Sequence, residues 1–224
     1  MPVSLSPYAL FGSGHSLAWS WISRCEYPWD ILHEISKLIL EIGPTLDPAA
    51  YDHPADDVWI AKSATIAPTA FVGGPCIIGE ETEVRHGAFI RGSALVGDKC
   101  VVGNSVELKN CILFDGVQVP HYNYVGDSVL GFRAHMGAGA VTSNVKSDKT
   151  MVAVHNDGEV IETYLKKMGA ILGDFVEVGC NSVLNPGTVV CPRSNIYPLS
   201  SVRGVVPPDS ILKSGKGVEI VPKE

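Results

Sequence analysis

The sequence lacks several features that would place it in a specialised class of proteins. No apolar run approaches the roughly 20 residues that a membrane-spanning helix needs. The first residues show no basic segment followed by an apolar core, as a secretory signal would. Positive charge is also scarce, because 17 Lys and Arg stand against 24 Asp and Glu, for a net charge of -7. Nucleic acids require a basic surface, so we expect no nucleic-acid partner and no membrane.

Cysteine patterns typical of zinc sites are absent as well. The chain has 6 cysteines, and none forms a C-x-x-C pair or a zinc-ribbon spacing. A chain of 224 residues is large enough to form a sizeable core without disulfides. Together with the missing secretory signal, this predicts reduced thiols in a cytoplasmic protein.

A repeat of six residues is the main positive feature. A branched aliphatic residue occupies every sixth position from Ile60 to Leu108, and the spacing resumes from Leu172 to Val202. The side chain four residues after the aliphatic one is usually small. A period of six fits neither an α-helix nor a coiled coil. It fits an all-β parallel solenoid, in which aliphatic side chains stack inside and small residues fill the corners.

Two segments fall outside this repeat. Residues 28–43 have apolar side chains at helical spacing, with Pro28 near the start and Gly43 after the end. We expect a helix there that caps the open first coil. Residues 145–168 interrupt the repeat, and within them Asn156-Asp157-Gly158 separates two β-rich runs. That pattern predicts an inserted β-hairpin arm.

The repeat therefore divides the chain into three parts. We expect an N-terminal helical cap and linker, a β-helix that carries the inserted arm, and a C-terminal cap with a flexible, Lys/Gly-rich tail. These parts are residues 1–57, 58–206 and 207–224.

Polar residues that do not help the stacking gather in the middle of the chain. Arg91 and Lys109 lie 18 residues apart, which is one coil of three hexads, so they should share an edge of the solenoid. Two such cations can bind a phosphate or diphosphate, although a solvated edge explains them equally well. His121 follows Pro120 directly. From the residues alone it is either a structural imidazole or a base that works near neutral pH.

The run from 104 to 144, NSVELKNCILFDGVQVPHYNYVGDSVLGFRAHMGAGAVTSN, resembles one known family. It is similar to the acetyltransferase half of the bifunctional N-acetylglucosamine-1-phosphate uridyltransferase/glucosamine-1-phosphate N-acetyltransferases, with their pattern K…H-x-x-Y-x-G-D…N-x-G-A-G-x-x-x-x-N. The resemblance extends over roughly residues 58–206. It implies a left-handed β-helix of hexapeptide repeats, and a homotrimer with each coenzyme site between neighbouring chains.

The resemblance also implies an activity and a set of site residues. The activity is transfer of an acetyl group from acetyl-CoA to the amine of an amino-sugar 1-phosphate, in nucleotide-sugar synthesis and without a metal. The general base would be His121, and the backbone N–H of Ala138 would face the acetyl carbonyl. The residues implied in acceptor binding are Arg91, Lys109, Tyr124, His135 and Asn144. Those implied in coenzyme A binding are Ala138, Cys180 and Lys166.

This sequence departs from the family pattern at several points. His135 stands where the family has asparagine, Val145 replaces a tyrosine, and the segment after Asn144 is longer. About 50 residues precede the repeat, too few for a nucleotide-binding sheet, so we expect no uridyl transfer.

Two other functions remain open. Zinc enzymes of the γ-carbonic anhydrase class share this β-helix and need two histidines about five residues apart plus a third upstream. His86, His121 and His135 are spaced differently. A non-catalytic hexapeptide-repeat scaffold or regulatory subunit is the second alternative.

Overall fold

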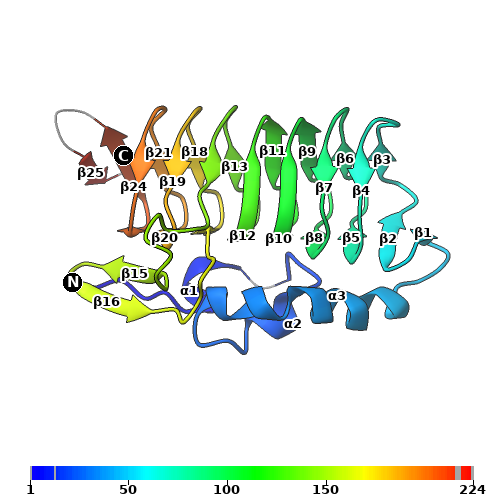
Figure 1. Ribbon diagram of the computed structural model, residues 1–224, viewed down its shortest axis with the longest axis horizontal. Helices are drawn as coiled ribbons and strands as arrows, with labels where there is room; N and C mark the ends of the chain where they lie inside the picture. The colour runs from blue at the N-terminus through cyan, green and yellow to red at the C-terminus, as the bar shows by residue number, and fades with distance from the viewer. Residues whose placement is uncertain (1, 13, 215–217, 223–224) are drawn as a thin grey trace.

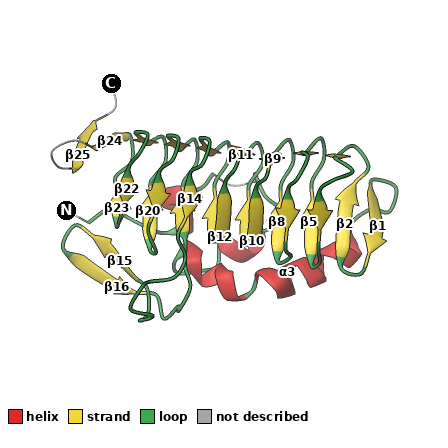
Figure 2. Ribbon diagram, turned by 45° about the horizontal axis from the view of Figure 1, so that its top comes forward, coloured by secondary structure: helices red, strands yellow, loops and turns green. Residues whose placement is uncertain are grey.

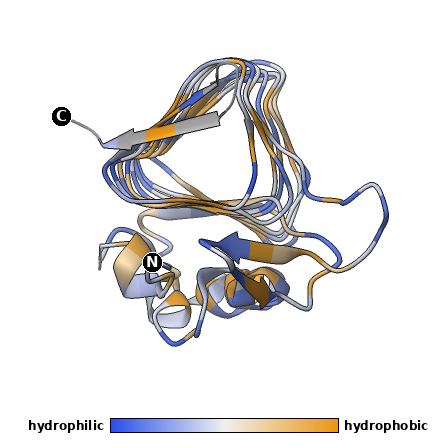
Figure 3. Cartoon of the chain, turned by 90° about the vertical axis from the view of Figure 1, so that its left-hand side faces the viewer, coloured by the Kyte–Doolittle hydropathy of each residue, from blue (hydrophilic) through white to orange (hydrophobic). Residues whose placement is uncertain are grey.

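Short parallel strands wind around one axis and stack into sheets along the length of the molecule (Figure 1). Seen along that axis, the coil has a triangular outline (Figure 3). The computed structural model describes residues 2–12, 14–214 and 218–222. The predicted fold, a left-handed parallel β-helix with an inserted hairpin, is confirmed.

The three sides of the triangle are called the first, second and third face. The first face contains β2 (Val58–Ala61), β5 (Cys76–Ile78), β8 (Ala94–Val96), the C-terminal halves of β10 (Glu107–Leu113) and β12 (Tyr124–Leu130), β17 (Ala170–Leu172), β20 (Thr188–Val190) and β23 (Val205–Val206). The second face contains β4 (Phe71–Val72), β7 (Phe89–Ile90), the N-terminal halves of β10 and β12, β14 (Val141–Thr142), β19 (Val183–Leu184) and β22 (Ser201–Val202). The third face contains β3 (Thr65–Ile66), β6 (Glu83–Val84), β9 (Val101–Asn104), β11 (Gln118–His121), β13 (His135–Met136), β18 (Glu177–Val178), β21 (Asn195–Ile196) and β24 (Ser210–Ser214).

The repeat positions stack inside the coil, as the six-residue period predicts. Ile78 pairs with Val96 in parallel register, 18 residues later, and both are fully buried. The next partner of Val96 is Leu113, only 17 residues further on. This one-residue shortening explains why the sequence pattern slips after Leu108. The interior remains a continuous column of aliphatic side chains.

The N-terminal region differs from the single helix predicted over residues 28–43. It contains α1 (Pro7–Leu10), α2 (Trp19–Ile22), η1 (Pro28–His33), α3 (Ile35–Ile42) and η2 (Gly43–Thr45), of which η1 and η2 are 3₁₀ helices. No helix among the described residues is long and apolar enough to span a membrane.

These helices cover the side of the coil (Figure 2). The predicted position, over the open end of the first coil, is therefore wrong. α3 packs against β8 and β10, and η1 packs against β12. The reason is a second apolar column that points outward from the first face, which only a covering layer can bury. This column pairs in register and consists of Ile77, Leu95, Ile112, Val129, Ile171 and Val189.

Antiparallel strands flank both ends of the coil. At one end β1 (Tyr51–Ala55) pairs with β2, and at the other β25 (Val218–Pro222) pairs with β24. The Lys/Gly-rich segment that we expected to be flexible includes 215–217 and 223–224, which lie outside the described residues.

The inserted hairpin consists of β15 (Ala153–Asn156) and β16 (Glu159–Glu162). Asn156 pairs with Glu159, and the two turn residues Asp157 and Gly158 both have positive φ, 47° and 86°. This is the type I′ geometry that the Asp-Gly pair favours. The arm packs back onto the molecule beside α1 (Figure 1), because Val152 and Val154 are fully buried.

Candidate active site

Four of the predicted acceptor residues meet at the edge between the second and first faces. Lys109 pairs with Gly126 in parallel register, and Glu107 pairs with both Phe89 and Tyr124. This stacking brings together a group that we call the cationic corner. Its members are Arg91, Lys109, Tyr124, Asp127 and Asn144.

Asp127 holds the cationic corner together. Its side chain is almost completely buried, and the Lys109 Nζ lies 3.2 Å from each carboxylate oxygen. Asn110 donates its Nδ2 to the same carboxylate at 2.9 Å, and Asn144 donates to its other oxygen. Asn110 also donates to the carbonyl of Leu32 at 3.1 Å, which ties this corner to η1. We did not single out Asp127 from the sequence, although it ends the quoted G-D pair.

Arg91 and Tyr124 lie on the solvent side of the same corner. The Arg91 guanidinium donates to Glu107 Oε1 at 2.7 Å, and both side chains are partly exposed. Asn144 donates its Nδ2 to the Tyr124 hydroxyl at 3.2 Å. Burial raises the pKa of Tyr124, and the nearby Asp127 carboxylate adds to this effect. The hydroxyl therefore stays protonated and can donate a hydrogen bond to a ligand.

His121, Ala138 and Cys180 lie at the opposite edge of the second face, where it meets the third; we call this edge the histidine corner. The His121 side chain is exposed, whereas its backbone is held on both sides. Its N–H donates to Asn123 Oδ1 at 3.1 Å, and its carbonyl accepts from the Gly139 N–H at 3.0 Å. His121 is thus a solvent-facing imidazole on a fixed support, and not a buried structural one.

Asn123 supplies that support from inside the corner. It is 2% exposed and donates its Nδ2 to the carbonyls of Gly137 and Ala140, at 2.8 and 3.0 Å. Close packing contributes as well, because a Cβ on Gly103 would lie 1.6 Å from the Pro120 carbonyl oxygen. Only glycine allows the preceding coil to approach His121 this closely.

Ala138 presents a free donor near His121. Its carbonyl accepts from the Asn181 N–H at 2.8 Å, but its own N–H has no partner among the described residues. The neighbouring coil places Cys180 directly against Gly137, where a Cβ would come 3.0 Å from the Cys180 Sγ. An N–H of this kind can stabilise negative charge on a carbonyl oxygen.

The two corners flank the same short strands. Two residues separate His121 from Tyr124, and Tyr124 pairs with Val141 in the sheet of the second face. A ligand lying across this face could reach the imidazole at one edge and the cations at the other. The helices and the hairpin lie along the first face, so they leave the second face uncovered, as they do the third (Figure 3).

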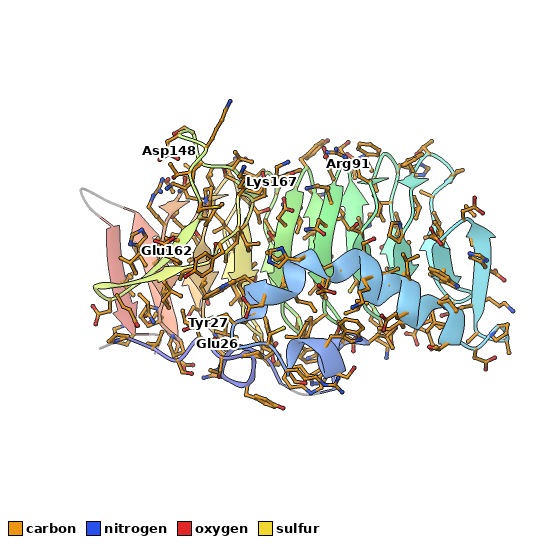
Figure 4. All side chains as sticks on the ribbon, turned by 60° about the horizontal axis from the view of Figure 1, so that its bottom comes forward. Glu26, Tyr27, Arg91, Asp148, Glu162 and Lys167 are labelled. Atoms are coloured by element: carbon orange, nitrogen blue, oxygen red, sulfur yellow. The ribbon has the colours of Figure 1, made fainter. Side chains whose placement is uncertain are left out.

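The remaining predicted site residues are placed elsewhere. His135 lies on β13 in the third face, where its Nδ1 is 2.7 Å from Glu177 Oε2, so the chain by itself does not bring it to the cationic corner. Lys166 lies where the arm returns to the coil, close to the hydrogen bond from the Met168 N–H to the Asn144 carbonyl. Figure 4 shows the adjoining Lys167 on the same side of the coil as Arg91.

The three histidines considered for zinc do not form a ligand set. His86 and His121 occupy the histidine corner two coils apart, and His86 Nδ1 is bonded to Thr69 Oγ1 at 2.9 Å. His135 is bonded to Glu177 on the third face. Within the described part of the chain, no three His, Cys, Asp or Glu side chains are placed to hold a metal ion.

Comparisons with known proteins agree with the resemblance read from residues 104–144. The protein named Bifunctional protein GlmU from Methanococcus maripaludis is 31% identical over 174 residues, which are 76% of this chain and 42% of that protein. The bifunctional sugar-1-phosphate nucleotidylyltransferase/acetyltransferase of Sulfurisphaera tokodaii is 34% identical over 91 residues, 41% of this chain and 23% of that protein. The chain thus spans less than half the length of these curated relatives.

The chain was also compared with solved structures and with family models. The Francisella novicida UDP-N-acetylglucosamine acyltransferase is 15% identical, with a TM-score of 0.49 over 75% of this chain and 67% of that one. Residues 72–202, more than half of the chain, match the model described as the GMPPB C-terminal domain. The chain therefore belongs to the family of GMPPB C-terminal domains.

Proposed function

We propose that this chain transfers an acetyl group from acetyl-CoA to the amine of an amino-sugar 1-phosphate, as a step in nucleotide-sugar synthesis. The observation that carries this proposal is the pair of corners on either side of the second face. An exposed histidine lies at one edge, and two cations with a tyrosine and an asparagine lie at the other. Relatives named for sugar-1-phosphate nucleotidylyl and acetyl transfer support it.

In this proposal the cationic corner binds the acceptor. Arg91 and Lys109 bind the sugar phosphate through charge-assisted hydrogen bonds. Lys109 can do so while it contacts Asp127, since an ammonium group carries three donors. Tyr124 and Asn144, which already contact each other at 3.2 Å, bind sugar hydroxyls. The carboxylates of Glu107 and Asp127 orient the two cations before the ligand arrives.

The histidine corner carries out the chemistry. The sugar amine loses a proton to His121 and attacks the thioester carbonyl, so that a C–N bond forms and the C–S bond breaks. The Ala138 N–H donates to the carbonyl oxygen as negative charge develops there. The leaving thiolate then takes a proton from His121. No covalent enzyme intermediate is required.

Coenzyme A would bind at the histidine corner, beside Ala138 and Cys180, and extend its phosphates across the second face toward Lys166. We propose that the chain forms a homotrimer in which a neighbouring chain closes this groove. Within one chain, His135 lies on the third face and away from the cationic corner.

The test is a steady-state comparison of acceptor variants. Lys109→Gln and Arg91→Gln should each raise KM for the amino-sugar phosphate about 10- to 100-fold, as expected for loss of one charge-assisted contact. Arg85→Gln is the matched control, because Arg85 is an exposed cation paired with Glu83 on the third face. An unchanged KM in both variants would show that the phosphate binds elsewhere.

A further inference from the structure

A second polar hollow, of about 470 Å³, lies where the third face meets the first. It is separated from the cationic corner by the width of the first face. The proposed acetyl transfer makes no use of it. Its lining includes Lys99, Gly116, Gln118, Arg133 and His135.

Lys99, Gly116 and Arg133 occupy the same corner position in three successive coils. Each has a positive φ, 55°, 72° and 55°, and each donates its N–H to the corner of the preceding coil. Strands in a sheet are about 4.8 Å apart, so the two cations are separated by about 10 Å along the edge. Gly116 has no side chain, and a Cβ there would lie 3.0 Å from the Arg133 Cγ. The glycine therefore leaves room for the stem of Arg133 beside the hollow, which Lys99 borders as well.

Two further polar side chains, Gln118 and His135, line the hollow from the third face. Gln118 pairs in register with His135, whose Nδ1 contacts Glu177 Oε2 at 2.7 Å. This contact fixes the ring and leaves Nε2 as the other polar atom of the imidazole. Lysine, arginine, glutamine and histidine thus surround one position.

The carboxylates near the hollow already have partners. Asp115 Oδ1 accepts from the Asp98 N–H at 2.9 Å, and Glu177 is bonded to His135. The cations are less occupied. Lys99 is 4.0 Å from Glu81, and the Arg133 guanidinium packs 5.1 Å from the Phe132 ring. Arg133 has no carboxylate partner among the residues that the structure describes.

We propose that this hollow binds the phosphate group of a small phosphorylated ligand. Arg133 presents two parallel N–H groups to the phosphate oxygens, and Lys99 contributes a point charge from the opposite side. Gln118 donates from the third face, and His135 borders the hollow there. The site requires neither the histidine corner nor the cationic corner.

Calorimetric titration with inorganic phosphate and with glucosamine 1-phosphate tests this site, and NMR of the His135 ring follows the same titration. Arg133→Gln and Lys99→Gln should each weaken phosphate binding by about tenfold. Arg193→Gln is the matched control, because Arg193 occupies the same corner further along the coil and is bonded to Asp209 at 2.6 and 2.7 Å. All three side chains are exposed, and circular dichroism checks that the variants stay folded.

Binding that shifts the His135 resonances and is lost in Arg133→Gln but kept in Lys109→Gln supports the proposal. The opposite pattern, loss in Lys109→Gln alone, would show that anions bind only at the cationic corner. An equal loss in Arg193→Gln would show a diffuse charge effect without a site. Absence of any response at millimolar phosphate would also overturn the proposal.

Discussion

Asp127 shows how one buried carboxylate can organise a binding corner. It is 4% exposed and accepts hydrogen bonds from Lys109, Asn110 and Asn144. Its carbonyl accepts from the Gly169 N–H at 2.8 Å, at the point where the arm rejoins the coil. A charge buried to this extent is tolerated only because these donors surround it.

Removal of this carboxylate should therefore destabilise the folded protein. We expect Asp127→Ala to lower the free energy of unfolding by about 2–4 kcal/mol, because three donors lose their partner in a mostly buried place. Urea denaturation measures the change. Asp148→Ala is the control, since Asp148 is exposed and pairs with Lys146 on the surface, and we expect a much smaller change there. Equal effects would contradict a central role for Asp127.

At the residue scale, the sequence predicted contacts well where the repeat is regular. Arg91 and Lys109 are one coil apart, and they do share an edge. His135 pairs in register with Gln118 on the third face, so it lies on a different face from the acceptor cluster. The hydrogen bond of His135 to Glu177 could not be predicted, because it joins residues across the 24-residue insertion at 145–168.

At the element scale, the arm and the N-terminal segment stabilise each other. Asn156 is 3% exposed, accepts from the Val3 N–H at 3.1 Å and donates to the Val3 carbonyl at 2.9 Å. The two segments are 153 residues apart in the chain. Side-chain amides that satisfy a backbone N–H and C=O in this way act as a substitute strand partner.

Asn156→Ala should detach the N-terminal segment locally without unfolding the coil. We expect faster amide hydrogen exchange in residues 2–6, while the interior strands keep their protection. Val160→Ala on the facing strand is the control, because Val160 is 55% exposed. If protection of residues 2–6 is the same in both variants, the contact with Val3 does not hold the segment.

The sequence predicted the hairpin but misplaced the helix, and the reasons are physical. An Asp-Gly turn is a local signal that needs no tertiary information. The apolar side of a helix shows that this side is covered, but it does not show what covers it. Both the open end and the side of the coil could have done so. The outward column that includes Ile77, Leu95 and Ile112 decides between them. In the sequence this column is visible because the strands of the first face are apolar at consecutive positions and do not alternate between apolar and polar residues.

On the scale of the whole molecule, the three faces are covered unequally. Helices and arm cover the first face, whereas the second face exposes Phe71, Phe89 and Val183, by 57%, 43% and 37%. Large exposed side chains in one strip are typical of an interaction surface. The proposed homotrimer would bury this strip.

Val183→Glu should therefore separate the trimer into single chains of 23.9 kDa, because it places a charge in the interface. Light scattering coupled to size exclusion measures the mass. Leu40→Glu on the helical side is the control, since Leu40 is 42% exposed and lies away from the second face. A wild type that already has the mass of one chain would remove the inter-subunit coenzyme site from the account.

The most direct test of the proposed function is thiol release from acetyl-CoA, measured with a panel of amino-sugar phosphates for the wild type and for His121→Ala. We expect turnover with at least one amino-sugar 1-phosphate, and a fall in kcat of about 10²- to 10⁴-fold in the variant, which is the range expected for loss of a general base. The exposed position of His121 means that the variant should stay folded. A folded wild type without turnover on any acceptor, or a variant as active as the wild type, would contradict the account.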